Sequence, residues 1–179
     1  MGDRTDSSCR MRPMQAADLE RVLVWRNAPS VRRNMYTRHA IGKEEHQAWF
    51  ERISGDATRH PLIFEIDDVA SGFVNFSVSG EGAIAEWGFY AAPQSPKGTG
   101  ARMGHTALHH GFEALGLHKI SAQALAQNAA SIRFHLRLGF RQEGVLRDQH
   151  FDRQQYHDVV CFGLLASEWR SNDQKGEPE

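Results

Sequence analysis

PQSPKGTGARMG, residues 93–104, places two glycines and a lysine directly before a segment with a helical pattern. Two explanations are open. The start of a helix carries unpaired N–H groups and partial positive charge, and glycine allows an anion such as phosphate to approach that backbone closely. A tight turn alone also needs glycine, because only glycine adopts its backbone angles freely. Other parts of the sequence are needed to decide whether this turn binds phosphate or is only a tight turn.

The segment after this turn predicts a helix that packs on a sheet. Its small and apolar side chains recur at helical spacing and form one stripe, made of Gly104, Ala107, Leu108, Gly111, Phe112 and Leu115. The opposite face is polar and consists of Arg102, His105, His109 and Glu113. Residues 117–125 then predict a strand, and residues 128–138 predict a helix that ends at Gly139.

The flanking segments complete a mixed α/β pattern. Two further helices are expected, over residues 16–29 with Pro29 as the stop and over residues 42–53. The other β-rich runs are residues 9–14, 61–67, 70–79, 82–91, 140–152 and 154–169. Three of them, within residues 61–91, predict an antiparallel meander, and the last two predict a long hairpin. We therefore expect a mixed, mostly antiparallel sheet flanked by helices.

Composition is that of an ordinary globular domain. Of the 179 residues, 40% are hydrophobic and 24% are charged, and the net charge is −1. We expect a single domain over residues 10–170, with polar flexible tails at residues 1–9 and 171–179. The charge gives no sign of a nucleic-acid partner, and no apolar run approaches the ~20 residues of a membrane span. Two cysteines and no apolar signal core predict a cytoplasmic location.

The glycine turn, its helix, the following strand and the run NAASIRFHLRLGF at residues 128–140 resemble the GNAT superfamily of acetyl-CoA-dependent N-acetyltransferases. In that family a Gln/Arg-x-x-Gly-x-Gly/Ala turn binds the cofactor's pyrophosphate. The matching residues here are 95–100, with Ser95 at the first position, so the backbone rather than that side chain is expected to bind.

This resemblance implies a GNAT fold and acetyl-CoA as co-substrate. It also implies that successive backbone N–H groups of the turn form a nest around the pyrophosphate. The residues of this nest are Lys97, Gly98, Thr99, Gly100, Ala101 and Arg102. Asn128 and Ser131 match the family's second cofactor motif. Asn128 also suits the role of a helix cap, and the two roles are compatible.

Several segments resemble more narrowly the N-acetyltransferases of pseudaminic acid biosynthesis. These segments are residues 25–27, 44–46, 85–93, 96–100, 118–128 and 143–169. Those enzymes acetylate the 4-amino group of a UDP-linked amino-dideoxy sugar, whose product feeds a nonulosonic acid that decorates bacterial flagellin or surface polysaccharide. Ribosomal-protein alanine N-acetyltransferases share residues 25–27 and the late hairpin and remain an alternative. A GNAT domain that binds CoA without catalysis is a second alternative.

Acetyl transfer to an amine needs a neutral amine, an N–H group for the developing oxyanion and a proton for the departing thiolate. GNAT enzymes usually take that proton from a tyrosine of the second motif, and the matching residue here is His135, on one helix face with Asn128 and Ser131. An inert surface histidine is the alternative. Glu86 is the candidate base, because strand alternation places it on one face with Tyr90. A plain ion pair for Glu86 and simple packing for Tyr90 stay open.

The amino-terminal helices cover the acceptor in the GNAT family, so their polar residues are candidates for acceptor binding. They are Arg26, Asn27, Tyr36 and His46. Arg26 suits a nucleotide diphosphate, although Arg26 and Asn27 also suit the end of a helix. No metal site is expected, because the histidine pair at residues 105 and 109 has no third ligand nearby. The oligomeric state stays open, a homodimer included.

Overall fold

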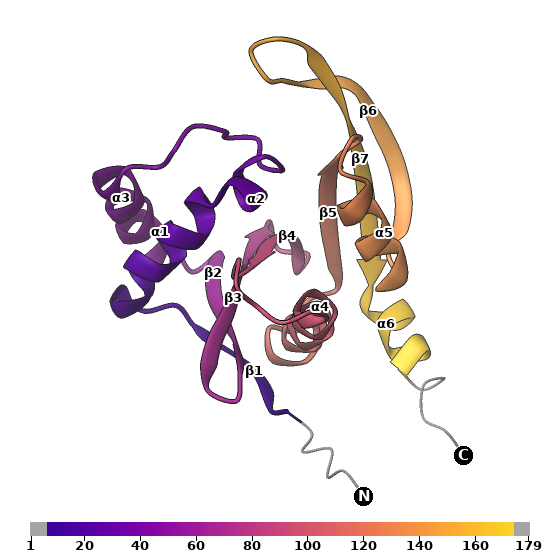
Figure 1. Ribbon diagram of the computed structural model, residues 1–179. Coiled ribbons are helices and arrows are strands. Elements are labelled where there is room, and N and C mark those ends of the chain that lie inside the picture. The colour runs from indigo at the N-terminus through magenta and orange to yellow at the C-terminus, as the bar shows by residue number, and fades with distance from the viewer. Residues whose placement is uncertain (1–6, 174–179) are drawn as a thin grey trace, which may run out of the picture.

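The computed structural model describes residues 7–173, in which seven strands form one sheet (Figure 1). The strands are β1 (Cys9–Pro13), β2 (Arg59–Ile66), β3 (Val69–Ser79), β4 (Ile84–Ala91), β5 (Lys119–Leu125), β6 (Arg141–Phe151) and β7 (Tyr156–Leu165). Their order across the sheet is β1-β2-β3-β4-β5-β7-β6. Only β4 and β5 pair in parallel. The expected mixed, mostly antiparallel sheet is therefore confirmed.

The helices follow the predicted pattern with two differences. They are α1 (Leu19–Asn27), α2 (Pro29–Arg32), α3 (Lys43–Ser54), α4 (Thr99–His109), α5 (Ala129–Arg137) and α6 (Ala166–Asp173). The predicted stop is confirmed, because α1 ends at Asn27, two residues before Pro29. The short helix α2 was not predicted; it begins at Pro29, because proline lacks only an N–H that the first helical turn leaves unpaired. The last predicted strand ran to residue 169, but β7 ends at Leu165 and α6 follows directly.

The folded part of the chain extends beyond the predicted limits of residues 10 and 170. Strand β1 already pairs with β2 at Cys9, and α6 runs to Asp173. The other predicted tail residues, 1–6 and 174–179, lie outside the described residues.

Helices cover both faces of the sheet. The larger core lies between the sheet and α4, α5 and α6, and the predicted stripe on α4 faces it. A Cβ atom at Gly104 would lie 2.7 Å from Leu138 Cδ1, so glycine is what allows α4 to pack closely on α5. A smaller core joins α1 and α3 to the opposite face, where Val22 and Trp25 pack with Ile63 and Phe73.

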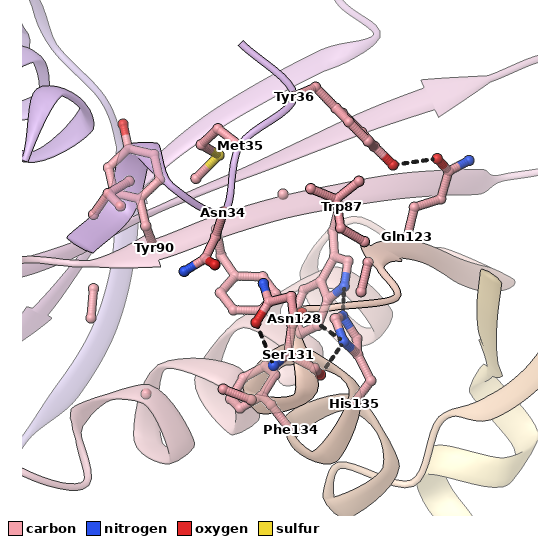
Figure 2. A pocket seen from close by; sticks show the side chains of 18 of the residues that line it. Asn34, Met35, Tyr36, Trp87, Tyr90, Gln123, Asn128, Ser131, Phe134 and His135 are labelled. Atoms are coloured by element: carbon pink, nitrogen blue, oxygen red, sulfur yellow. Dashed lines mark hydrogen bonds between the residues drawn. The ribbon is translucent and has the colours of Figure 1, made fainter. Parts of the chain in front are cut away.

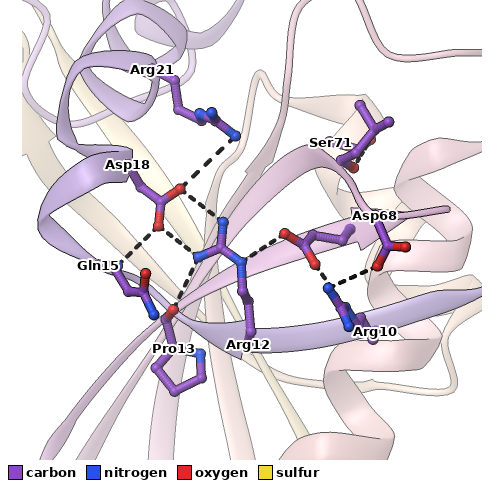
Figure 3. A network of polar contacts seen from close by, with 10 residues as sticks. Arg10, Arg12, Pro13, Gln15, Asp18, Arg21, Asp68 and Ser71 are labelled. Atoms are coloured by element: carbon purple, nitrogen blue, oxygen red, sulfur yellow. Dashed lines mark hydrogen bonds and ion pairs between the residues drawn. The ribbon is translucent and has the colours of Figure 1, made fainter.

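Ion pairs fasten this amino-terminal layer to the edge of the sheet (Figure 3). The Arg12 guanidinium bonds Asp18 at 2.6 Å and Glu65 at 2.7 Å, and Arg10 bonds Glu65 at 2.7 Å. Asp18 and Glu65 are both buried. Burial of carboxylates is tolerated because each one is paired and hydrogen-bonded. Strand β1 and the turn before α1 are thereby held to β2.

Strands β4 and β5 diverge in the middle of the sheet. They pair only where Ile84–Glu86 meets Lys119–Ser121, although both strands continue beyond these residues. Helix α4 forms the crossover between them, so its start lies beside the opening. The β6–β7 hairpin extends past the rest of the sheet on the same side (Figure 1).

Candidate active site

A cavity of about 580 Å³ occupies the gap between β4 and β5 (Figure 2). It reaches from the amino-terminal helices on one face of the sheet to α4 and α5 on the other. Seven of the predicted site residues line it: Tyr36, Glu86, Tyr90, Gly100, Asn128, Ser131 and His135. The structure therefore brings the predicted cofactor turn, second motif and base to one place.

The backbone of β4 is free on the side that faces this gap. The Ala92 N–H donates to the Ser71 carbonyl oxygen at 2.9 Å, on the β3 side. Backbone groups alternate along an antiparallel pair, so residues 88 and 90 also face β3, whereas Phe89 and Ala91 face the gap. An N–H group at Phe89 can therefore donate to an oxygen of a molecule in the cavity.

The glycine turn forms the start of α4, and Gly98 takes a positive φ of 88°. Two of the six predicted N–H groups already have acceptors. Thr99 donates to Pro96 at 3.2 Å and Arg102 donates to Gly98 at 3.3 Å. Within residues 7–173, the turn N–H groups without an acceptor are those of Lys97, Gly98, Gly100 and Ala101. Four of the six predicted N–H groups are therefore available to bind an anion.

Asn128 caps α5, as one of the two predicted roles requires. Its Oδ1 accepts the Ser131 backbone N–H at 3.1 Å. The side-chain amide also lines the cavity, and its N–H₂ group has no partner among the described residues. Both predicted roles are compatible with this geometry.

His135 lies in the core, 1% exposed, so the surface position considered for it is wrong. Its Nε2 accepts the Trp87 Nε1–H at 3.2 Å, and its Nδ1–H donates to the Ser131 carbonyl oxygen at 2.8 Å (Figure 2). Because a Trp side chain only donates, these partners assign a neutral imidazole with its proton on Nδ1. Burial lowers the pKa of His135, which favours the same form. Nε2 carries no proton, and the Nδ1 proton is already bonded to the Ser131 carbonyl oxygen, which argues against His135 as the predicted proton donor.

Glu86 is exposed at the edge of the cavity, on the face predicted by strand alternation. Among the described residues its carboxylate has no hydrogen-bond or ion-pair partner. Tyr36 lies on the same side, and its hydroxyl donates to Gln123 Oε1 at 3.0 Å (Figure 2). Burial first, and then the charge of Glu86, raise the pKa of Tyr36. The phenol is therefore protonated and the carboxylate is free to accept a proton.

A second cavity of about 540 Å³ adjoins the first, and Tyr90 lines both. Arg26 and His46, two predicted acceptor-binding residues, line this second cavity between α1, α3 and the loop of residues 37–41. Arg26 Nη2 donates to the Thr37 carbonyl oxygen at 2.9 Å, whereas its Nη1 is buried without a partner. Burial lowers the pKa of Arg26, yet a guanidinium stays charged in proteins.

Asn27 lines neither cavity. Its side-chain amide brackets the Ile41 backbone, with Nδ2 donating at 2.9 Å and Oδ1 accepting at 2.8 Å. The predicted acceptor contact is therefore replaced by a structural one, because both polar atoms are already bonded to the chain.

Sequence reasoning missed the loop of residues 33–42, which crosses from the amino-terminal helices to the final hairpin. Arg38 bonds Asp152 at 2.9 Å, and the Tyr36 ring packs on His150 with 4.9 Å between centroids. It also missed Gln123 and Trp87. A lone glutamine in the apolar run of residues 120–125 is a signal that could have pointed to Gln123.

Comparison with known proteins decides the family. The acetyltransferase (GNAT) domain family matches residues 9–141. The chain belongs to the GNAT family. It is an acetyl-CoA-dependent N-acetyltransferase, and acetyl-CoA is its co-substrate.

Three relatives of this GNAT enzyme match different shares of the chain. The spermidine N(1)-acetyltransferase of Escherichia coli is 25% identical over 164 residues, which cover 90% of this chain and 88% of that protein. The acetyltransferase PseH of Campylobacter jejuni is 24% identical over 122 residues, 68% of this chain and 76% of that protein. The uncharacterized N-acetyltransferase YokL of Bacillus subtilis is 35% identical over 89 residues, 48% of this chain and 50% of that protein.

Among solved structures, the spermidine N-acetyltransferase of Vibrio cholerae in complex with CoA and spermine superposes with a TM-score of 0.83. It is 21% identical, and the match covers 90% of this chain and 98% of that chain. This likeness establishes the GNAT fold. In residues 7–173 no cluster of three or more His, Cys, Asp or Glu side chains could hold a metal ion. No helix within that range is long and apolar enough to cross a membrane.

Proposed function

We propose that the enzyme acetylates the 4-amino group of a UDP-linked amino-dideoxy sugar, as in pseudaminic acid biosynthesis. The observation that carries the proposal is the separation of charge along one face of β4. The free carboxylate of Glu86 lies beside the first cavity, and the guanidinium of Arg26 lies at the second. Glu86 and Tyr90 are four residues apart, about 13 Å along a strand. An acceptor with an amine at one end and a diphosphate at the other fits this arrangement.

Charge favours such an acceptor over a polyamine, the second candidate that the E. coli relative supports. The ionised side chains of the second cavity are Arg26, Arg52 and Glu45, a net charge of +1. A polyamine carries only positive charge, so this cavity disfavours it, whereas a diphosphate gains two guanidinium partners. Trp49 and Phe73 add apolar walls suited to a base or sugar.

The residues of the first cavity suit direct transfer of the acetyl group, which acetyl-CoA supplies as a thioester. Glu86 takes the proton that the attacking amine loses. The Phe89 N–H faces the gap and stabilises negative charge on the acetyl oxygen. No residue of α5 protonates the leaving thiolate, and a thiol with a pKa of about 8.5, judged from cysteine, leaves without strong help. The free N–H groups of the turn, those of Lys97, Gly98, Gly100 and Ala101, bind the pyrophosphate.

Thiol release from acetyl-CoA tests the proposal. The acceptors are the UDP-4-amino sugar, spermidine, a peptide with an N-terminal alanine, and none. We expect kcat/KM for the sugar to exceed that for every other acceptor at least tenfold, about 1.4 kcal/mol in transition-state binding. Arg26→Ala should raise KM for the sugar more than KM for acetyl-CoA. Arg33→Ala, an exposed arginine outside both cavities, is the matched control.

Each other result has a definite meaning. A higher kcat/KM for spermidine or for the peptide would make that acceptor, and not the sugar, the proposed substrate. CoA binding without acetyl transfer to any amine would favour the non-catalytic alternative. Equal effects of Arg26→Ala and Arg33→Ala would remove Arg26 from acceptor binding.

A further inference from the structure

His46 is buried in the wall of the second cavity with one ring nitrogen unused. It is 6% exposed, and its Nε2 has no hydrogen-bond partner in the described structure. The Leu19 backbone raises the pKa of His46, which is the effect of a nearby carbonyl oxygen on an imidazole N–H. Because Nε2 has no acceptor, we assign the proton of the neutral ring to Nδ1, which leaves Nε2 with a lone pair.

The surroundings of His46 keep it neutral while the cavity is empty of anions. Burial is the largest cause that lowers its pKa, and the positive charge of Arg26 on α1 lowers it further. The other charged or titratable groups around this cavity are Glu45 and Arg52 on α3 and Tyr90 on β4. Burial raises the pKa of Tyr90 far above its usual value, so the phenol carries no charge.

A diphosphate in this cavity would raise the pKa of His46 and favour its protonated form. Its negative charge offsets Arg26, whose Nη1 is also buried without a partner. It also offers an oxygen acceptor to a protonated Nε2, which has no other partner. Trp49 stacks on the imidazole with 5.0 Å between ring centroids and an interplanar angle of 16°. An aromatic face of this kind favours the cationic form of the ring.

We propose that His46 takes up one proton at Nε2 when the diphosphate of the acceptor enters the second cavity. Acceptor binding is then coupled to pH at a residue that does not touch the reacting amine. This inference rests on the proposed function, because it assumes a diphosphate in the acceptor. The bound state holds more protons than the free state, so affinity falls as pH rises, by up to about tenfold per pH unit between the free and bound pKa values of His46.

Calorimetry with UDP-N-acetylglucosamine measures the coupling, since this nucleotide sugar has no amine to acetylate and no phosphate that titrates near neutral pH. Titrations at pH 7 in buffers of different ionisation enthalpy give the number of protons taken up. We expect uptake of up to one proton with the nucleotide sugar and none with uridine. His46→Gln, whose amide can donate without gaining a proton, should bind with no uptake and a flat pH dependence. His109→Gln, an exposed histidine on α4, should behave as wild type.

Binding of the nucleotide sugar to the wild type without proton uptake would overturn the inference, and this measurement needs no variant. Unchanged uptake in a folded His46→Gln protein would overturn it as well. The proposed function is judged separately, by acetylation of the UDP-4-amino sugar. Acetylation without binding of the probe in this cavity would defeat the inference alone. Proton-coupled binding of the probe without acetylation of the sugar would defeat the function alone.

Discussion

At the scale of single residues, the contacts of a side chain decide its role more than its place in a motif. His135 stands where the GNAT family usually has a tyrosine, yet both of its ring nitrogens are bonded inside the core. Asn27 directly follows Arg26, yet it holds the Ile41 backbone while Arg26 lines a cavity. These differences depend on partners that sequence spacing does not reveal, such as Trp87, which is 48 positions from His135.

His135→Phe separates the structural role from the catalytic one. Loss of the imidazole leaves the buried Trp87 N–H without a partner. We expect the free energy of unfolding to fall by about 1–3 kcal/mol, while the shape of the kcat–pH profile stays that of the wild type. Urea unfolding and a pH–rate profile measure both. A ten- to hundredfold loss of kcat that His135→Tyr restores would return His135 to the role of proton donor.

At the scale of elements, the start of α4 carries the cofactor prediction. A Cβ atom at Gly100 would meet only Phe134 Cε2, at 4.0 Å, so the fold tolerates a larger residue there. Gly100→Val should nevertheless raise the Kd for acetyl-CoA about tenfold or more, because its branched side chain covers N–H groups that face the pyrophosphate. Gly55→Val, at the end of α3 with open space around it, is the matched control. Equal Kd values in the two folded variants would contradict the phosphate-binding turn.

The sequence predicted most elements because their periodicity is local. The stripe on α4, the meander of β2, β3 and β4 and the final hairpin all have side-chain patterns that repeat within a few residues. It did not predict the loop of residues 33–42 across the cavity, because the partners of Tyr36 and Arg38 are 87 and 114 positions away. It also did not predict α2, because the same Pro29 that stops α1 suits the first turn of a following helix.

At the scale of the whole molecule, the site depends on two layers being held against one sheet. The face with α4 and α5 carries the cofactor motifs, and the face with α1 and α3 carries the acceptor candidates Arg26 and His46. The gap between β4 and β5 connects them, so acetyl donor and amine meet only if both layers keep their positions. An apolar core joins the second layer to the sheet, and the ion pairs of Arg12 add a polar link to the turn before α1, which makes that arginine relevant to the acceptor side.

Arg12→Gln tests this connection. The hydrogen bond from Arg12 is the main cause that lowers the pKa of Asp18. For Glu65, burial raises the pKa, but the hydrogen bonds from Arg12 and Arg10 outweigh burial, so the pKa of Glu65 is lowered overall. A carboxyl group whose pKa is lower in the folded state stabilises it above the unfolded pKa, and this stability is lost as pH falls through the folded pKa. At pH 7 the variant should lose about 3 kcal/mol, the low end for removing one partner of a buried ion pair.

The difference from wild type should shrink below about pH 4, near the unfolded pKa values of Asp and Glu, as the carboxylates gain protons. Urea unfolding from pH 3 to 7 measures this, with Arg59→Gln at an exposed pair, 3.8 Å from Asp56, as a control expected to change stability by less than about 1 kcal/mol. Because Arg12 links the sheet to Asp18, directly before α1, KM for the acceptor should rise while the Kd for acetyl-CoA stays that of the wild type. A loss of stability that does not depend on pH would show that Arg12 acts through packing. An equal rise in KM for the acceptor and in the Kd for acetyl-CoA would show that the two layers are not held to the sheet separately.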